Sequence, residues 1–201
     1  MARRKDRALE ADRQKQVIQA TIQLLAEESW QSVTLARVSE RAGVSKGVVT
    51  YWFPTKDALF LAAIRRFHEE YAENLSKIAL QPMSSRERMK VLLEAVLPSQ
   101  AQLSTEIRFQ TEVWSYAKEH PEVEQEVRQA WRDFRDACAM LMDVAIADGY
   151  VRRPNARGLD RFIHAIIDGL SLHLAYGLQD DVVEVRERLL VLLEDWFQSP
   201  Q

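Results

Sequence analysis

Apolar side chains recur at every third or fourth position along almost the whole chain, and strand-like alternation is nearly absent. This spacing puts them on one face of a helix, so the pattern predicts an all-α protein. Serine and threonine caps, prolines and glycines divide it into about nine helices. We expect one helix from about residue 12 to 28, helices capped by Thr34, Ser45, Thr55, Ser84 and Ser104, and three more at about 121–148, 155–178 and 181–197.

Two of the predicted helices are short and adjacent, in the segment LARVSERAGVSKGVVTYWFPTK that begins at Leu35. Leu35 and Val38 form an apolar face on the first helix, and Val49 and Phe53 form one on the second. Gly43, between them, admits a tight turn. This spacing is typical of a helix-turn-helix, whose second helix lies in the major groove of DNA. The alternative is a plain pair of antiparallel helices, which is common in all-α proteins.

The outward face of the second short helix suits contact with DNA. Lys46 can meet phosphate or guanine, and Gly47 permits a close approach of the backbone. Thr50 and Tyr51 can donate to phosphates or touch base edges. Lys56, at the start of the next helix, would add a phosphate contact that carries no sequence information.

The distribution of charge agrees with a DNA-facing N-terminal segment, although the net charge of −3 does not indicate one. Residues 1–56 hold ten of the 27 Lys and Arg and six of the 30 Asp and Glu, a net charge of +4. The remainder holds 17 bases and 24 acids, a net charge of −7. Such asymmetry is typical of a basic DNA-binding head on an acidic body, and the alternative is an ordinary solvated surface.

The segment TLARVSERAGVSKGVVTYWFPTKDALF, from Thr34 to Phe60, resembles the tetracycline-repressor (TetR) family of bacterial transcriptional regulators nearly position by position. Many members carry tyrosine where this chain has Thr50, so the phosphate contact expected at this position either stays with Thr50 or passes to Tyr51. By this resemblance, the DNA contacts come from Thr34, Ser45, Lys46, Gly47, Thr50, Tyr51 and Lys56.

The resemblance also implies an architecture and a mode of action. It divides the chain into an N-terminal basic arm with a helix-turn-helix domain at residues 1–56 and a larger ligand-sensing and dimerisation domain at 57–201. It implies a homodimer whose two heads occupy successive major grooves of a palindromic operator, with half-sites about one helical turn apart.

The last two predicted helices carry apolar residues on more than the one face that packs within the chain. The extra apolar surface favours contact with a partner protein. Gly169, in the middle of a helix, is explained by a close approach between helices. We expect a four-helix dimer interface, and the alternative is a helix pair buried within one chain. The residues assigned to the interface are Ile166, Gly169, Leu170, Leu189 and Leu193.

Aromatic residues cluster in the body and predict a pocket for an apolar or cationic effector. The residues assigned to it are Phe109, Trp114, Trp131, Phe134 and Cys138. The alternative is that these side chains only pack the core. The stretches 107–134 and 163–177 resemble the choline-sensing repressors of glycine-betaine synthesis. This resemblance implies a quaternary ammonium ligand bound in an aromatic cage, with Trp114 and Trp131 as two of its walls.

The residue patterns of enzymes are missing from the sequence. His164 and Asp168 stand four positions apart and could form a base with its orienting carboxylate, but no nucleophile accompanies them, and a plain hydrogen bond is the simpler interpretation. No glycine-rich phosphate loop and no metal-ligand spacing is present, so we expect neither cofactor nor metal.

The single cysteine, Cys138, suits a reducing compartment. With no membrane-length apolar run and no secretory signal, the sequence predicts a cytoplasmic protein without membrane contact. Two functions remain at this point. One is a dimeric DNA-binding regulator, a repressor released from its operator by a small molecule. The other is a helical interaction or ligand-carrier protein that does not bind DNA.

Overall fold

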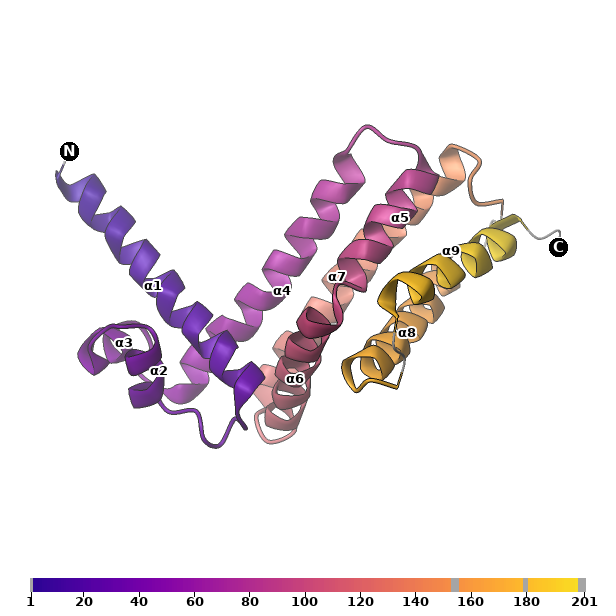
Figure 1. Ribbon diagram of the computed structural model, residues 1–201. Helices are drawn as coiled ribbons and strands as arrows, with labels where there is room; N and C mark the ends of the chain where they lie inside the picture. The colour runs from indigo at the N-terminus through magenta and orange to yellow at the C-terminus, as the bar shows by residue number, and fades with distance from the viewer. Residues whose placement is uncertain (1, 153–155, 179–180, 199–201) are drawn as a thin grey trace. The chain divides into compact units, whose positions relative to one another are not determined.

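The computed structural model describes residues 2–152, 156–178 and 181–198 (Figure 1). This part of the chain consists of nine helices with no strand, so the predicted fold class is confirmed. No helix in the described ranges is both long and apolar enough to cross a membrane. The helices are α1 (Ala2–Glu27), α2 (Leu35–Arg41), α3 (Lys46–Trp52), α4 (Lys56–Leu80), α5 (Ser85–Val96), α6 (Gln100–Ala117), α7 (Pro121–Ala147), α8 (Ala156–Ala175) and α9 (Val182–Gln198).

Contacts group these helices into two compact units. The first unit comprises residues 1–69 and 108–128, and the second comprises 70–107 and 129–201. Three long helices, α4, α6 and α7, therefore contribute residues to both units. The boundary expected after residue 56 divides the chain by function rather than by contacts, and it stays a prediction.

Most of the predicted helix starts are confirmed by their caps. The Thr34 hydroxyl oxygen accepts a hydrogen bond from the backbone N–H of Arg37, and Ser45 and Thr55 cap α3 and α4 in the same way. Ser84 forms the reciprocal capping box with Glu87 at the start of α5. Pro121 opens α7, as its fixed φ angle favours.

Two predicted helix starts were wrong. Helix α1 begins at Ala2 rather than near residue 12, because the segment predicted as a basic arm consists mainly of good helix formers without glycine or proline. Helix α6 begins at Gln100 rather than after Ser104. Its cap is Ser99, whose hydroxyl accepts from the Gln102 backbone N–H at 3.4 Å while the Gln102 side-chain oxygen accepts from the Ser99 backbone N–H at 3.3 Å.

The start of α9 is set by similar local chemistry. Asp181 caps α9 by accepting a hydrogen bond from the Val183 backbone N–H at 2.8 Å. The start expected at Asn155 for the eighth helix lies outside the described residues, and α8 is described from Ala156.

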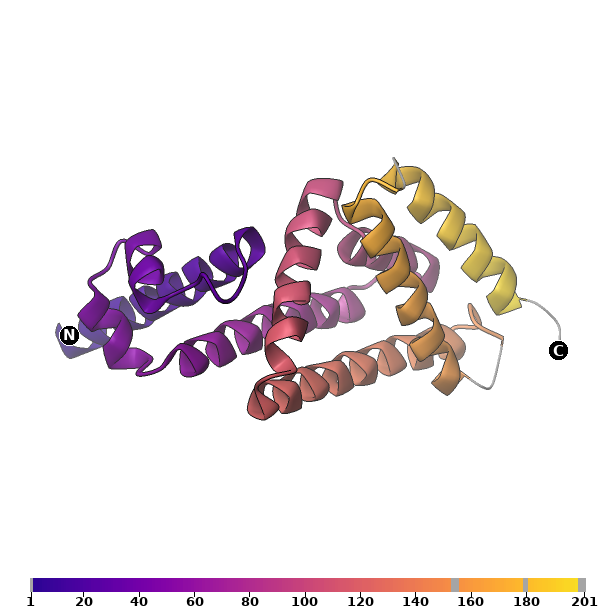
Figure 2. The ribbon, with the colours of Figure 1, turned by 90° about the horizontal axis from the view of Figure 1, so that it is seen from below.

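Each unit has its own apolar core. In the first unit, α1, α2 and α3 pack on one another through side chains that include Val17, Leu24 and Val38 (Figures 1 and 2). In the second unit, buried residues from parts of α4, α6 and α7 join those of α5, α8 and α9 in one cluster. The predicted DNA-binding residues thus stand on one packed scaffold, and the body helices pack around another.

Candidate DNA-binding surface and effector pocket

Helices α2 and α3 form the predicted helix-turn-helix. Gly43 lies between them with a φ of 64°, a left-handed conformation that glycine adopts without strain. Val38 of α2 and Val49 of α3 are fully buried on the inner side. On α3, Lys46 and Gly47 are exposed. Helix α3 therefore has one face bound to the core and one face open to a partner.

Ion pairs join α2 to the end of α1. Arg41 donates two hydrogen bonds to the Glu27 carboxylate, at 2.9 and 2.6 Å, and Arg37 pairs with Glu28. The hydrogen bonds from Arg41 lower the pKa of Glu27 below its ordinary value. Exposed pairs contribute little to stability, but they commit both α2 arginines within the protein. Lys46 is then the cation that α3 presents outward.

The hydroxyl groups of the predicted contact residues are partly engaged. As N-caps, Thr34 and Ser45 use their oxygens as acceptors, which leaves each O–H able to donate to a phosphate. The Thr50 hydroxyl instead donates back to the Lys46 carbonyl at 3.1 Å or the Gly47 carbonyl at 3.2 Å. Tyr51 is 78% exposed, so its phenol is the group that reaches outward.

Lys56 has a different setting from Lys46. Its ammonium group donates to the Trp30 carbonyl oxygen at 2.5 Å and lies over the rings of Trp30 and Phe60, at 5.2 and 5.0 Å from their centroids. Burial lowers the pKa of Lys56 below its ordinary value. This lysine therefore holds the turn between α1 and α2, and the phosphate contact expected of it stays a prediction.

The same turn is contacted by α6 within the first unit. The Trp30 backbone N–H donates to the Glu112 carboxylate at 2.7 Å, and the Trp30 ring meets Tyr116 edge-on at 4.9 Å. The Tyr116 hydroxyl in turn donates to the Asp57 carboxylate. The turn that precedes the helix-turn-helix is thus fixed by both α4 and α6.

One group of side chains in the first unit has the composition of a metal site. The ligand atoms of Asp57, His120 and Glu122 lie within 4.8 Å of one another. Tyr116 accounts for part of this cluster, because its hydroxyl binds Asp57 and its ring stacks on His120 at 3.8 Å. Asp57 and Glu122 also stand in the first turns of their helices, where the helix dipole favours acids. The cluster is therefore explained without an ion.

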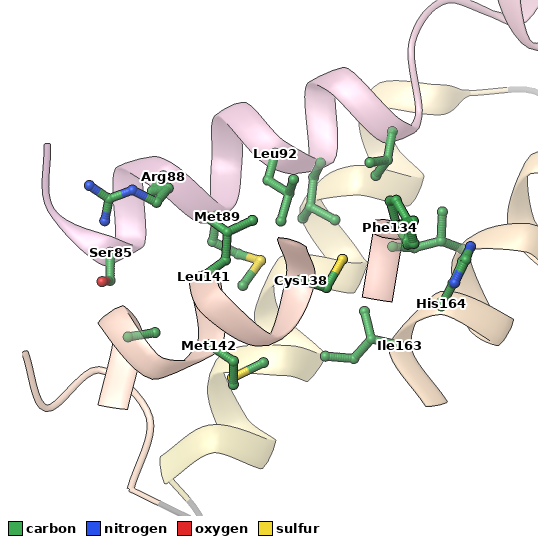
Figure 3. Close-up of a pocket in the computed structure, with 14 residues that line it drawn as sticks. Ser85, Arg88, Met89, Leu92, Phe134, Cys138, Leu141, Met142, Ile163 and His164 are labelled. Carbon is green, nitrogen blue, oxygen red and sulfur yellow. The ribbon is translucent and has the colours of Figure 1, made fainter. Parts of the chain in front are cut away.

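A pocket of about 60 Å³ lies in the second unit between α5, α7 and α8 (Figure 3). Most of its wall is apolar. Figure 3 shows Arg88 and Ser85 at one end of the lining residues, and Phe134 and His164 at the other. The lining residues are Ser85, Arg88, Met89, Leu92, Leu93, Val96, Phe134, Cys138, Leu141, Met142, Ala145, Ile163, His164 and Ile167.

The His164 end of the pocket is aromatic and has an acid beside it. The His164 ring stacks on Trp131 at 4.5 Å and meets Phe134 at 4.3 Å. Its Nε2 atom lies 3.5 Å from the Asp168 carboxylate. Partial burial raises the pKa of Asp168 to about 6, while 48% of its side chain stays exposed. The two side chains are therefore close together, and their interpretation as a hydrogen-bonded pair stays a prediction.

The residues predicted to bind the effector are not brought together. Phe134 and Cys138 line the pocket. Trp131 does not line it but stacks on His164, which does. Phe109 is instead buried against Phe67, at 4.4 Å between ring centroids, and Trp114 is 43% exposed. Neither belongs to the lining. Sequence reasoning missed the α5 wall, although the methionine and leucine spacing from Met89 to Val96 was the available signal.

The residues predicted for the dimer interface also differ in their settings. Gly169 is exposed, and Ile166 and Leu170 are half-buried. Leu189 and Leu193 are buried inside the second unit, because that face of α9 packs within the chain. The exposed large apolar side chains of α8 and α9 are Phe162, Leu172, Val183, Val191 and Leu192.

A helix-turn-helix with an open second helix, together with a helical unit that encloses a pocket, defines the class of ligand-responsive DNA-binding regulators. Comparison with known families identifies the member of this class. Residues 17–63 match the family described as bacterial regulatory proteins of the tetR family, and residues 85–199 match the C-terminal domain of BetI-type transcriptional repressors. The chain belongs to the tetR family and is a DNA-binding transcriptional regulator of the repressor type.

Individual relatives agree with this assignment. The chain is 27% identical to the HTH-type transcriptional regulator BetI 1 of Chromohalobacter salexigens over 87% of this chain and 85% of that protein. Its fold is similar to that of a transcriptional regulator from Saccharomonospora viridis solved in complex with choline, with a TM-score of 0.79 and 23% identity, covering 92% and 96% of the two chains. FadR from Bacillus subtilis, solved with stearoyl-CoA, has a TM-score of 0.69 and 14% identity, covering 93% and 99%.

Proposed function

We propose that this regulator is a homodimer that places α3 of each copy in the major groove of a palindromic operator. The observation that carries the proposal is the two-sided α3, with Val49 fully buried and Tyr51 78% exposed. Lys46 and Tyr51 would contact phosphates and base edges, and Gly47 would let the backbone approach. Thr34, Ser45, Thr50 and Lys56 complete the proposed contact surface.

The experiment selects DNA fragments from a random pool with the full-length protein and then measures binding to the selected fragment by fluorescence anisotropy. We expect a palindromic site with half-sites about one helical turn apart. Tyr51→Ala should bring affinity for that site close to affinity for unrelated DNA. A pool that yields no preferred sequence would exclude sequence-specific binding and favour the helical carrier protein.

We further propose that the pocket between α5, α7 and α8 is the effector site. It is mostly apolar with polar groups at its ends, which is typical of small-molecule sites. Effector binding would change the DNA affinity by favouring one arrangement of the dimer, so the effector must bind the free and DNA-bound states differently. Residues 56–80 form one continuous helix, α4, that starts four residues after α3 ends and could transmit such a change.

A cationic effector is one candidate, favoured by the His164 end of the pocket. Stacked rings beside a carboxylate attract a quaternary ammonium group. The choline complex of the Saccharomonospora viridis protein supports this version. Calorimetry with choline tests it, with Asp168→Asn expected to weaken binding at pH 7.5. If choline does not bind the wild-type protein, the cationic version is excluded.

The dimer interface is proposed on the outer faces of α8 and α9. Several large apolar side chains are exposed there, which is typical of a surface that meets a partner. Ile166, Gly169 and Leu170 remain in the proposed interface, while the exposed side chains of α9 take the place of Leu189 and Leu193. A second copy of this chain would bury them in a four-helix arrangement.

A further inference from the structure

The end of the pocket next to α5 contains a buried arginine with incomplete hydrogen bonding. Arg88 is only 9% exposed. One of its terminal nitrogens, Nη2, donates to the carbonyl oxygens of Gln81 and Met83, at 2.8 and 3.2 Å. Its Nε–H is buried and has no acceptor. A buried donor without a partner is costly, and Arg88 lines the pocket, so a shift of its guanidinium group toward a bound acceptor would be favourable.

The charge of Arg88 is also uncompensated. No carboxylate in the described ranges forms an ion pair with it. The Asp148 carboxylate near Ser85 is already engaged, since it accepts hydrogen bonds from the Ser85 hydroxyl and from the Tyr150 backbone N–H at 3.1 Å. Guanidinium groups stay charged in proteins, and a buried charge without a counter-ion is unfavourable. An anion bound at this end would supply the missing partner.

The wall that continues from Arg88 is apolar. Met89, Leu92, Leu141 and Met142 follow it along the lining, before the pocket reaches His164 (Figure 3). The part of a bound anion that extends from its charged group would therefore be apolar and would contact these side chains. Methionines adapt to such an apolar part because their side chains are flexible and polarisable.

We propose that the pocket binds a small amphipathic anion, a short aliphatic carboxylate whose oxygens accept from Arg88 and whose chain contacts the methionine and leucine wall. The proposal rests on the proposed role of this pocket as the effector site. It differs from a purely cationic effector, which the guanidinium group would repel at this end. The cavity volume of about 60 Å³ suits a short chain rather than a long one.

The test measures binding to the full-length protein by calorimetry. The probes are acetate, butyrate and hexanoate, each compared with the uncharged amide of the same length. We expect affinity to rise about fourfold for each methylene that becomes buried. Each carboxylate should bind at least about tenfold more tightly than its amide, because a hydrogen bond to a charged group is worth more than a neutral one.

Variants of Arg88 test whether this residue binds the carboxylate group. Arg88→Met should lose about tenfold or more in carboxylate affinity and lose less in amide affinity, because the amide carbonyl accepts only a neutral hydrogen bond. Arg88→Lys keeps the charge and should retain part of the preference for carboxylates. Arg86→Met is the matched control, because Arg86 is an exposed arginine on the same helix that pairs with Glu194 at 2.7 Å. Circular dichroism checks that each variant is folded.

The outcomes separate this inference from the proposed function. Equal affinity for carboxylates and amides, or unchanged carboxylate affinity in folded Arg88→Met and Arg88→Lys, would overturn the anion site. An affinity that is no higher for hexanoate than for acetate would also overturn it. If carboxylates bind in an Arg88-dependent way but leave operator affinity unchanged, the anion site stands and the effector role fails. If choline changes operator affinity and no carboxylate binds, the effector role stands and the anion site fails.

Discussion

Lys46 and Lys56 are ten residues apart, but their ammonium groups have different surroundings. Lys46 is exposed on α3, whereas the Lys56 ammonium group is held by the Trp30 carbonyl and by two aromatic rings. A charge on the surface contributes to DNA binding through the phosphates, and it is sensitive to salt. A charge that closes a turn contributes first to the stability of the fold.

The two lysines therefore give a first prediction. Lys46→Ala should reduce the salt dependence of DNA binding by about one unit in the slope of log K against log salt, without a change in melting temperature. Lys56→Ala should lower the melting temperature, because the Trp30 carbonyl loses its donor. Anisotropy titrations at several salt concentrations and thermal unfolding measure these effects. If Lys56→Ala also reduces the salt slope, its predicted phosphate contact is supported, and an unchanged slope removes that contact.

Asp168 gives a second prediction at the scale of one residue. Because burial raises the pKa of Asp168 to about 6, the folded protein binds more protons than the unfolded chain between about pH 4 and pH 6. The stability contributed by this group falls as the pH rises through that window, and the effect is small because about half of the side chain is exposed to solvent. Asp168→Asn should therefore raise the melting temperature more at pH 7.5 than at pH 4.5.

The control for Asp168 is Asp143→Asn, which changes an exposed aspartate of α7. Its melting temperature relative to wild type should not vary with pH in the same way. Thermal unfolding at a fixed protein concentration, at both pH values, makes the comparison. An effect of Asp168→Asn that is equal at pH 4.5 and pH 7.5 contradicts the raised pKa.

At the scale of elements, the helix-turn-helix contains two glycines with distinct functions. Gly43 has a φ of 64° in the turn, and a Cβ atom added there would meet nothing within 4 Å. The cost of a side chain at Gly43 is therefore backbone strain alone. Gly47 is helical, and a Cβ atom there would meet only the Ser45 hydroxyl oxygen, at 3.8 Å. The free protein has space for a side chain at Gly47, and the proposed DNA complex does not.

This difference gives a third prediction. Gly43→Ala should destabilise the protein by about 1–2 kcal/mol, because alanine is strained in the left-handed conformation. Gly47→Ala should leave stability unchanged or slightly raised, since alanine is the better helix former, but weaken operator binding. Chemical unfolding and anisotropy on the same samples distinguish the two effects. Operator affinity that is unaffected by Gly47→Ala would contradict close approach of this helix to DNA.

At the scale of the whole molecule, the proposed function depends on a second copy. One chain offers one DNA-facing helix, and a palindrome needs two at a fixed spacing. The exposed apolar side chains of α8 and α9 are the surface proposed to hold them together. DNA affinity should then depend on dimer formation and so on protein concentration.

The fourth prediction tests this surface with a matched pair of leucines. Leu192 of α9 is 66% exposed, and Leu80 at the end of α4 is 83% exposed. Leu192→Glu should convert the dimer to a monomer in sedimentation at micromolar concentration and weaken operator binding, because it introduces a charge into the apolar interface. Leu80→Glu should change neither property. A wild-type protein that sediments as a monomer would exclude the proposed interface altogether.

The helix-turn-helix was predictable from the sequence because its determinants are local. A cap such as Ser45 acts on a backbone group three residues away, and Gly43 sets its own backbone angle. The start of α6 was missed for a related reason. Ser99 and Gln102 form a capping box, but Ser104 is also a plausible cap by composition. Local rules identify helix ends well, and they choose poorly between neighbouring candidates.

The pocket and the interface depended on tertiary structure, because long-range packing decides which face of a helix is covered. Leu192 and Leu193 are adjacent and chemically identical, yet one is exposed and the other is buried. Phe109 and Phe134 are both aromatic residues on predicted helices, but only Phe134 lines the pocket. Periodicity by itself thus determined an all-helical chain, and the local signals of the helix-turn-helix, with its resemblance to the TetR family, predicted a DNA-binding regulator. Only the packing of distant helices decided where Arg88 is buried and which apolar side chains remain for a partner.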